Sequence, residues 1–191
     1  IWDIPSPYIG TTTSVILSQF QTNVLAFNGD LGHLLGYQGG GGLAATIMGL
    51  CGSWNDRKCY SGIGSDFDII PNYSWTINVV THEQGHLMGS HHTHACCWNG
   101  NNTAIDGCGP SLGYTDMSCG SCPVASVPTF GTIMSYCHLT TNIDFNLGFG
   151  NVDYCTQGNP EGLVIEDFND VCGQDGWVIH FWWQKFLKDE T

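Results

Sequence analysis

Basic side chains are scarce in this sequence. Its 191 residues include 4 Lys+Arg against 17 Asp+Glu, which gives a formal net charge of −13. A protein that binds nucleic acid or an anionic membrane surface by charge needs clustered Lys and Arg. The composition therefore argues against both kinds of partner. Acidic side chains also suit a structural Ca²⁺ ion, but no D-x-D-x-D-G loop assigns such an ion to particular residues.

Long apolar runs are lacking as well. No segment reaches transmembrane length and none resembles a signal peptide, so we predict no membrane span. The chain begins at Ile1 and not at Met, which is typical of a processed or trimmed product. A secreted enzyme would have lost its signal and usually an inhibitory pro-segment. Such a pro-segment, or an additional chain, is therefore an expected partner.

Cysteine, in contrast, is abundant. A hydrophobic content of 42% with 12% aromatics in 191 residues predicts one globular domain. An even, dense set of cysteines without Fe–S or zinc-ribbon spacing predicts a disulfide framework and an oxidising, extracellular compartment. Cys119-Gly-Ser-Cys122 has redox-motif spacing, but no βαβ pattern precedes it, which favours a structural role. The ten cysteines are Cys51, Cys59, Cys96, Cys97, Cys108, Cys119, Cys122, Cys137, Cys155 and Cys172.

One stretch carries the chemistry: Thr81 to His92 contains a complete H-E-x-x-H-x-x-G-x-x-H pattern. His82 and His86 are four residues apart, so on a helix they share one face and reach one metal. Gly89 accepts the left-handed conformation that ends many helices. The chain can then turn back and bring His92 to the same metal. Three protein ligands and a fourth position for water predict a catalytic zinc ion.

The remaining polar residues of this stretch have expected roles. Glu83 lies beside the metal, where it takes a proton from zinc-bound water and later passes it to the leaving amine. His91 competes with His92 as third ligand, but the spacing favours His92. His94 is expected in the loop or behind the ligands.

A second motif lies downstream, at Gly131-Thr132-Ile133-Met134-Ser135-Tyr136-Cys137. The long histidine motif followed by such a methionine turn resembles the metzincin zinc endopeptidases. The resemblance implies that Met134 forms an apolar floor beneath the metal without binding it. It also implies an α+β fold, in which a twisted mixed sheet packs on the active-site helix and disulfide-rich loops follow.

The expected elements follow the apolar pattern. A helix is predicted where apolar residues recur at helical spacing, and strands where short apolar runs are bounded by turn residues. The segments are a helix over 11–23, a strand over 30–37, a glycine turn at 39–42, a strand from 43 to about 50, a loop over 51–66, a strand over 67–70, and the metal helix with Ser74 as its N-cap.

The order of these segments over roughly residues 1–150 is similar to the reprolysin-like, adamalysin-type branch of the metzincins. The resemblance implies that Leu43–Met48 is the rim strand of the cleft, with Leu43, Ala44, Ala45 and Thr46 along it. A substrate peptide would add to this rim as an extra strand. The alternative is a buried strand with no substrate role.

Three departures from that branch stand out. Thr93 follows the third histidine where animal reprolysins carry Asp, which is similar to bacterial members. Tyr136 stands two residues after Met134, as in astacins and serralysins. In those enzymes this tyrosine approaches zinc and helps to stabilise the oxyanion. The resemblance implies the same role for Tyr136 here; the alternative is that its ring only packs the turn. Finally, the family's first strand and long helix are not represented before Ile1.

We therefore expect a single catalytic domain over 1–191. Residues 1–92 form its upper part, with the rim strand and metal helix, and 93–191 its lower part, with the methionine turn and a C-terminal helix at 177–187. The predicted function is a secreted zinc endopeptidase acting on proteins or peptides. The alternative is a latent, zinc-containing scaffold or binding module in an extracellular assembly, although such a module has no reason to keep Glu83.

Overall fold

The computed structural model describes residues 6–69, 72–99 and 101–149. Within them, the two longer helices are α1 (Thr13–Asn23) and α2 (Trp75–Leu87), and the strands are β1 (Gly32–Gly36), β2 (Gly41–Ala44) and β3 (Lys58–Gly62). Shorter helical turns are η1 (Gly49–Cys51), α3 (Cys108–Ser111), η2 (Cys137–Leu139) and η3 (Phe145–Leu147). The predicted helix at 177–187 lies outside the described residues.

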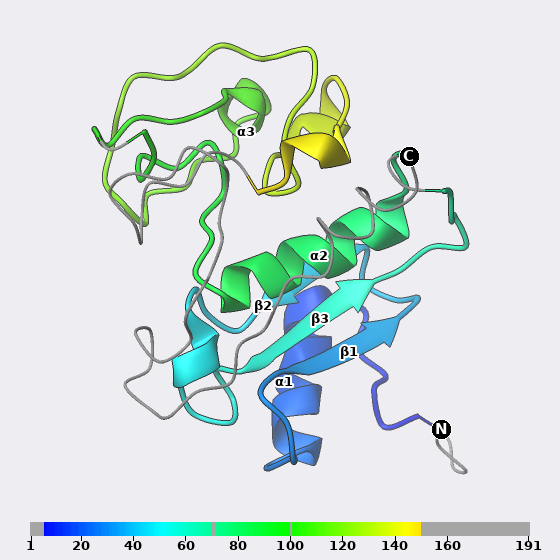
Figure 1. Cartoon of the computed structure of the whole chain (residues 1–191). Helices are drawn as coiled ribbons and strands as arrows, with labels where there is room; N and C mark the ends of the chain where they lie inside the picture. The colour runs from blue at the N-terminus through cyan, green and yellow to red at the C-terminus, as the bar shows by residue number, and fades with distance from the viewer. Residues whose placement is uncertain (1–5, 70–71, 100, 150–191) are drawn as a thin grey trace, which may run out of the picture.

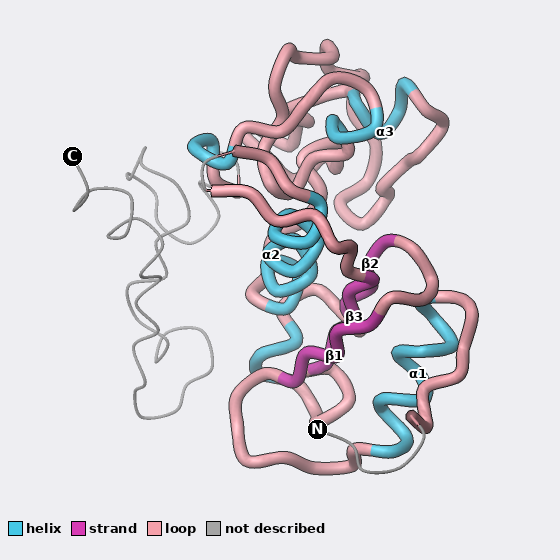
Figure 2. Tube along the Cα trace, turned by 90° about the vertical axis from the view of Figure 1, so that its right-hand side faces the viewer, coloured by secondary structure: helices cyan, strands magenta, loops and turns pink. Residues whose placement is uncertain are grey.

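The three strands form one mixed sheet in the order β1-β3-β2. β1 runs parallel to β3, whereas β2 runs antiparallel to it and occupies one edge. Figure 2 shows the strands between the two helices, with α1 on one face of the sheet and α2 on the other. The prediction of an α+β fold with a mixed sheet on the metal helix is confirmed at this level.

Helix α1 forms where the apolar spacing predicts it. The Thr12 hydroxyl accepts a hydrogen bond from the Val15 amide and caps the first turn. Ile16, Leu17 and Phe20 are buried on one side of the helix, where they form a core with Tyr60 of β3. This core fixes α1 against the sheet.

The central strand was not predicted. β3 lies in the segment expected to be loop, because Lys-Cys-Tyr-Ser-Gly contains no aliphatic residue and no alternation that marks a strand. All five of its residues are buried, and Tyr60 fits beneath α1. The strand predicted at 67–70 is wrong: Phe67 and Ile69 are 68% and 82% exposed and lie in irregular structure.

The predicted rim strand is shorter than expected and shifted. β2 begins within the glycine run at Gly41 and ends at Ala44, so Ala45 and Thr46 lie beyond it. The Ala45 amide still donates to the Lys58 carbonyl at 2.9 Å. The chain then turns at Met48, whose φ is +60°. Within the strand, Gly42 allows the Glu83 side chain of α2 to approach closely, whereas a Cβ atom on Gly41 would have nothing within 4 Å.

Helix α2 begins and ends near the predicted residues. Ser74 occupies the N-cap position, but its side chain does not cap; the Trp75 amide donates instead to the Asp66 carboxylate. At the other end, the helix finishes after Leu87, and Gly89 adopts a φ of +104°. Glycine is favoured there because a side chain would be strained. The chain reverses and leaves the helix axis (Figure 1).

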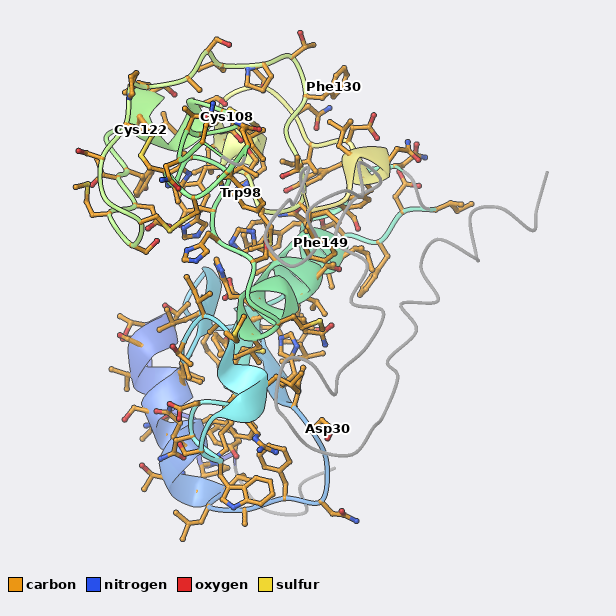
Figure 3. The ribbon with its side chains drawn as sticks, turned by 60° about the vertical axis from the view of Figure 1, so that its left-hand side comes forward. Asp30, Trp98, Cys108, Cys122, Phe130 and Phe149 are labelled. Atoms are coloured by element: carbon orange, nitrogen blue, oxygen red, sulfur yellow. A yellow bond between two sulfur atoms is a disulfide. The ribbon has the colours of Figure 1, made fainter. Side chains whose placement is uncertain are left out.

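Residues 93–149 are mostly loops held by three disulfides: Cys96–Cys122, Cys97–Cys119 and Cys108–Cys137. Cys119 and Cys122 therefore bond to the adjacent pair Cys97 and Cys96 and not to each other, which confirms their structural role. Figure 3 places Trp98, Cys108 and Cys122 together in this loop-rich part. Cys59, in β3, is a buried free thiol.

The loop-rich part has its own apolar core. Ile133, Met134, Ile143 and Phe145 are buried together, and Ile77 of α2 packs against them. The loops are thus attached to the same helix that covers the sheet. None of the helices in the described part of the chain is long and apolar enough to cross a membrane.

Candidate metal centre

Helix α2 presents two histidines on one face. His82 and His86 are each 7% exposed, and their ring centroids are 4.7 Å apart. His82 Nδ1 lies 2.8 Å from the carbonyl oxygen of Ile133, and His86 Nδ1 lies 2.8 Å from that of Ser90. Because a carbonyl only accepts hydrogen bonds, both Nδ1 atoms carry the proton. Each Nε2 therefore has a free lone pair.

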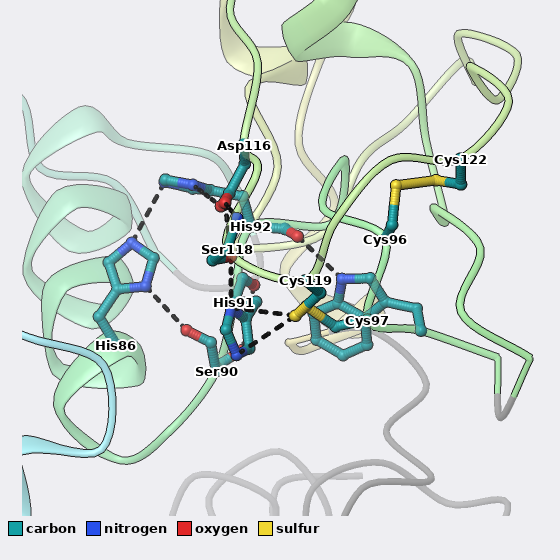
Figure 4. The surroundings of a disulfide bond; sticks show 11 residues. His86, Ser90, His91, His92, Cys96, Cys97, Asp116, Ser118, Cys119 and Cys122 are labelled. Carbon is teal, nitrogen blue, oxygen red and sulfur yellow. Dashed lines mark hydrogen bonds and ion pairs between the residues drawn. A yellow bond between two sulfur atoms is a disulfide. The ribbon is translucent and has the colours of Figure 1, made fainter.

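The turn at Gly89 brings a third histidine to the same place. His92 Nδ1 lies 2.9 Å from Asp116 Oδ2, and the His92 carbonyl accepts a hydrogen bond from Trp98 Nε1 at 2.8 Å. The Asp116 contact makes Nδ1 of His92 the donor and leaves its Nε2 facing His86 (Figure 4).

The three rings converge with the spacing that a metal requires. One nitrogen of each of His82, His86 and His92 lies within 4.8 Å of the others, and His86 Nε2 is 3.2 Å from His92 Nε2. Two nitrogens at roughly 2.0–2.1 Å from a tetrahedral zinc ion would be about 3.3 Å apart. Facing lone pairs cannot bond each other, so the donor set fits a cation.

Burial keeps two of these rings in the form that binds metal. Burial, with the neighbouring His86 and His92, holds the pKa of His82 well below its usual value. Burial and the neighbouring His92 lower the pKa of His86 to about 3. Both are neutral at physiological pH, and neutral imidazole is the metal-binding form.

The side chain of Glu83 extends from α2 to the edge of the sheet. It is 5% exposed, and its carboxylate accepts a hydrogen bond from the Ala44 amide of β2. Burial raises its pKa to about 8, although the Ala44 hydrogen bond opposes the shift. A carboxyl group with a pKa near neutrality both takes and releases protons under working conditions.

The strand edge fits tightly around this carboxyl group. A Cβ atom built on Gly42 would lie 2.6 Å from Glu83 Cδ, far inside van der Waals contact. Leu43 and Ala44 of the predicted rim therefore belong to the strand beside Glu83, whereas Ala45 and Thr46 lie beyond its end. The sequence order alone did not reveal that glycine is required at position 42.

The methionine turn lies beneath the helix. Met134 is fully buried, and a Cβ atom on Gly85 would lie 2.7 Å from Met134 Sδ. Glycine at position 85 thus lets the turn pack against α2. The same turn carries Tyr136, whose ring centroid is 4.8 Å from that of His92 and 6.3 Å from that of His82. Burial and the nearby carboxylates raise its pKa.

The two histidines that flank His92, His91 and His94, lie outside the cluster. His91 Nδ1 is 3.0 Å from Ser118 Oγ. His94 is buried and stacks on His92, with ring centroids 5.0 Å apart and planes inclined by 10°. His94 therefore supports a ligand ring from behind, as expected of a residue behind the ligands.

Asp116 is the site residue that the sequence did not reveal. It stands in a loop without periodicity, 24 residues after the histidine that it contacts. Hydrogen bonds from His92 and Ser118 hold its pKa well below the usual value. Two further clusters of potential ligands, around Cys97–Cys119 and Cys108–Cys137, consist largely of disulfide sulfur, which does not bind metal as thiolate does.

Comparison with known families bears on residues 1–93, which match the model described as metallo-peptidase family M12B, reprolysin-like. The chain is similar to the reprolysin-like metallopeptidases. The match includes His82, Glu83, His86 and His92 and ends directly after the third histidine. It supports a metzincin-like relative and a metallopeptidase domain over this part. No curated protein and no solved structure matches the chain.

Proposed function

We propose that this protein is a secreted zinc endopeptidase, with His82, His86 and His92 as the zinc ligands and Glu83 as the proton-transfer group. The observation that carries the proposal is the convergence of one ring nitrogen from each of the three histidines, next in sequence to the buried carboxyl group of Glu83. The reprolysin-like match over residues 1–93 supports the same activity. The disulfides support an extracellular site of action.

A zinc ion held there would activate a water molecule and polarise a peptide carbonyl. Glu83 takes the proton released by the attacking water and delivers it to the departing amine. The Ala44 amide donates a hydrogen bond to the carboxylate, and in the metal-free protein burial raises its pKa to about 8. Both halves of the proton transfer therefore use one carboxyl group in one place.

The edge of β2 is the proposed substrate platform. β2 pairs antiparallel with β3, and the Ala45 amide donates to the Lys58 carbonyl. In such a pair every second residue directs its backbone N–H and C=O groups to the partner strand. The backbone groups of Gly42 and Ala44 therefore point away from β3. The Ala44 amide already bonds Glu83. A peptide pairing along this edge would bring its backbone beside the carboxyl group, with Leu43 and Ala44 as the rim.

We further propose that Tyr136 stabilises the oxyanion through its hydroxyl group. Its ring lies against His92 and 5.3 Å from the ring of Tyr114. Met134 keeps the floor of the site apolar. A fixed phenol beside the metal ligands is suited to donate to a developing negative charge.

Cleavage of casein with and without o-phenanthroline, followed by addition of zinc, tests the proposed function. We expect the chelator to abolish cleavage and zinc to restore it. About one zinc ion per chain without any cleavage would contradict the proposal and favour a latent scaffold. Cleavage that persists with all zinc removed would also contradict it.

A further inference from the structure

We infer that Asp116 is a positioning residue that fixes His92 for metal binding. The inference rests on the proposed zinc site. Asp116 Oδ2 lies 2.9 Å from His92 Nδ1, so its carboxylate fixes which nitrogen carries the proton and how the ring is turned. Asp116 itself does not point a ligand atom into the cluster of three histidine nitrogens.

The carboxylate is held firmly in this position. Its other oxygen, Oδ1, accepts hydrogen bonds from the Ser118 amide at 3.0 Å and from the Ser118 hydroxyl group. The Ser118 hydroxyl also lies 3.0 Å from His91 Nδ1. Asp116 is thus part of a short network that connects its loop to His92 and to the preceding residue, His91.

Covalent bonds tie the same loop to the segment after His92. Cys97–Cys119 and Cys96–Cys122 join two adjacent residues of that segment to the loop that follows Asp116 (Figure 4). Trp98, next to Cys97, donates to the His92 carbonyl. The disulfides therefore hold Asp116 opposite the ring that it contacts, although 24 residues separate the two in sequence.

His92 needs this support more than the other ligands do. His82 and His86 stand on a helix and contact backbone carbonyls. His92 lies beyond the helix end, and its Nδ1 contacts a charged carboxylate. A carboxylate behind a histidine makes its other nitrogen a stronger ligand, and loss of such a partner typically lowers metal affinity 10–100-fold.

The test is the zinc dissociation constant of purified, disulfide-intact protein, measured by competition with a chromophoric chelator. For Asp116→Ala, we expect zinc binding to weaken about 10–100-fold. For Asp116→Asn, we expect a smaller loss, because its amide oxygen still accepts from His92 Nδ1. The visible spectrum of the Co²⁺-substituted protein should change in both variants, because the ligand field at His92 changes.

Asp30→Asn is the matched control. It removes the same charge from an exposed position that lies at the opposite end of the molecule from Trp98 (Figure 3), and it should leave zinc binding unchanged. Equal weakening by this control would overturn the inference, because the effect would then be general. If Asp116→Ala does not fold, the nearly isosteric Asp116→Asn decides.

Zinc affinity within twofold of wild type in the folded Asp116 variants, with an unchanged Co²⁺ spectrum, would overturn the inference. The readout is metal binding and not cleavage. A protein that binds zinc at the three histidines but cleaves nothing would contradict the proposed function and would still test the role of Asp116.

Discussion

Gly42 offers a test of how closely the strand edge surrounds Glu83. A Cβ atom at this position would lie 2.6 Å from Glu83 Cδ, whereas real Cβ contacts below 3.0 Å are essentially never seen. Gly42 does not have a positive φ, so Gly42→Ala adds a methyl group without backbone strain. The steric conflict falls on the carboxyl group of Glu83.

The size of the effect of Gly42→Ala depends on how far the Glu83 carboxyl group can move. The carboxyl group ends a flexible side chain, so it can shift away at the low end of the roughly 1–3 kcal/mol that overpacking costs. The same shift should strongly reduce catalysis, because Glu83 must stay within hydrogen-bond distance of the groups with which it exchanges a proton. General acid–base catalysis contributes about 10²–10⁴-fold, which corresponds to about 3–5 kcal/mol of barrier. We therefore expect a large loss of kcat with a small loss of stability.

The assay compares kcat on a peptide substrate, zinc content and the midpoint of thermal unfolding for Gly42→Ala and wild type. Gly29→Ala is the control, because its Cβ atom would lie 3.6 Å from Phe27 Cδ2, an ordinary contact. We expect zinc content to be unchanged in both variants. Full activity of Gly42→Ala would refute the close approach of β2 to Glu83.

Two further predictions concern the pH dependence of stability caused by Glu83 and the stabilisation of the oxyanion by Tyr136. In the metal-free protein, burial raises the pKa of Glu83 from 4.5 to about 8, so the folded state holds a proton that the unfolded state loses. The contribution of Glu83 to the free energy of unfolding should fall as pH rises from 4.5 to about 8, whereas the buried histidines contribute a slope of the opposite sign below their ordinary pKa. Glu83→Gln should therefore remove the falling part of the slope in chemical denaturation. Tyr136→Phe keeps the ring contacts with His92 and His82 but removes the hydroxyl group. If Tyr136 stabilises the oxyanion, kcat should fall by roughly 10² with KM unchanged; unchanged kcat would show that the ring only packs the turn.

The parts of the site that follow from local spacing were predictable. The relation of His82 to His86 is set by helix geometry, and the turn after the helix is set by Gly89, whose φ of +104° suits glycine. The order of these residues therefore predicted how the three histidines converge. The start of α1 also follows from local capping by Thr12, whereas the first amide of α2 donates to Asp66, nine residues earlier, and not to the predicted cap Ser74.

Other parts depend on contacts distant in sequence. β3 is a strand because Tyr60 and its neighbours are enclosed by α1, α2 and the two flanking strands, which a five-residue window does not indicate. Asp116 reaches His92 through a loop placed by disulfides whose pairing does not follow from cysteine spacing. For this reason, the contact between Asp116 and His92 could not be predicted from the sequence.

The most direct measurement of the central claim is the turnover of Glu83→Gln beside wild type at equal zinc content. Glutamine keeps the shape of the side chain but cannot take a proton from the attacking water. We predict about one zinc ion per chain in both proteins and a loss of kcat of at least about 10²–10⁴-fold in the variant. A zinc-loaded Glu83→Gln protein with wild-type turnover would contradict the account.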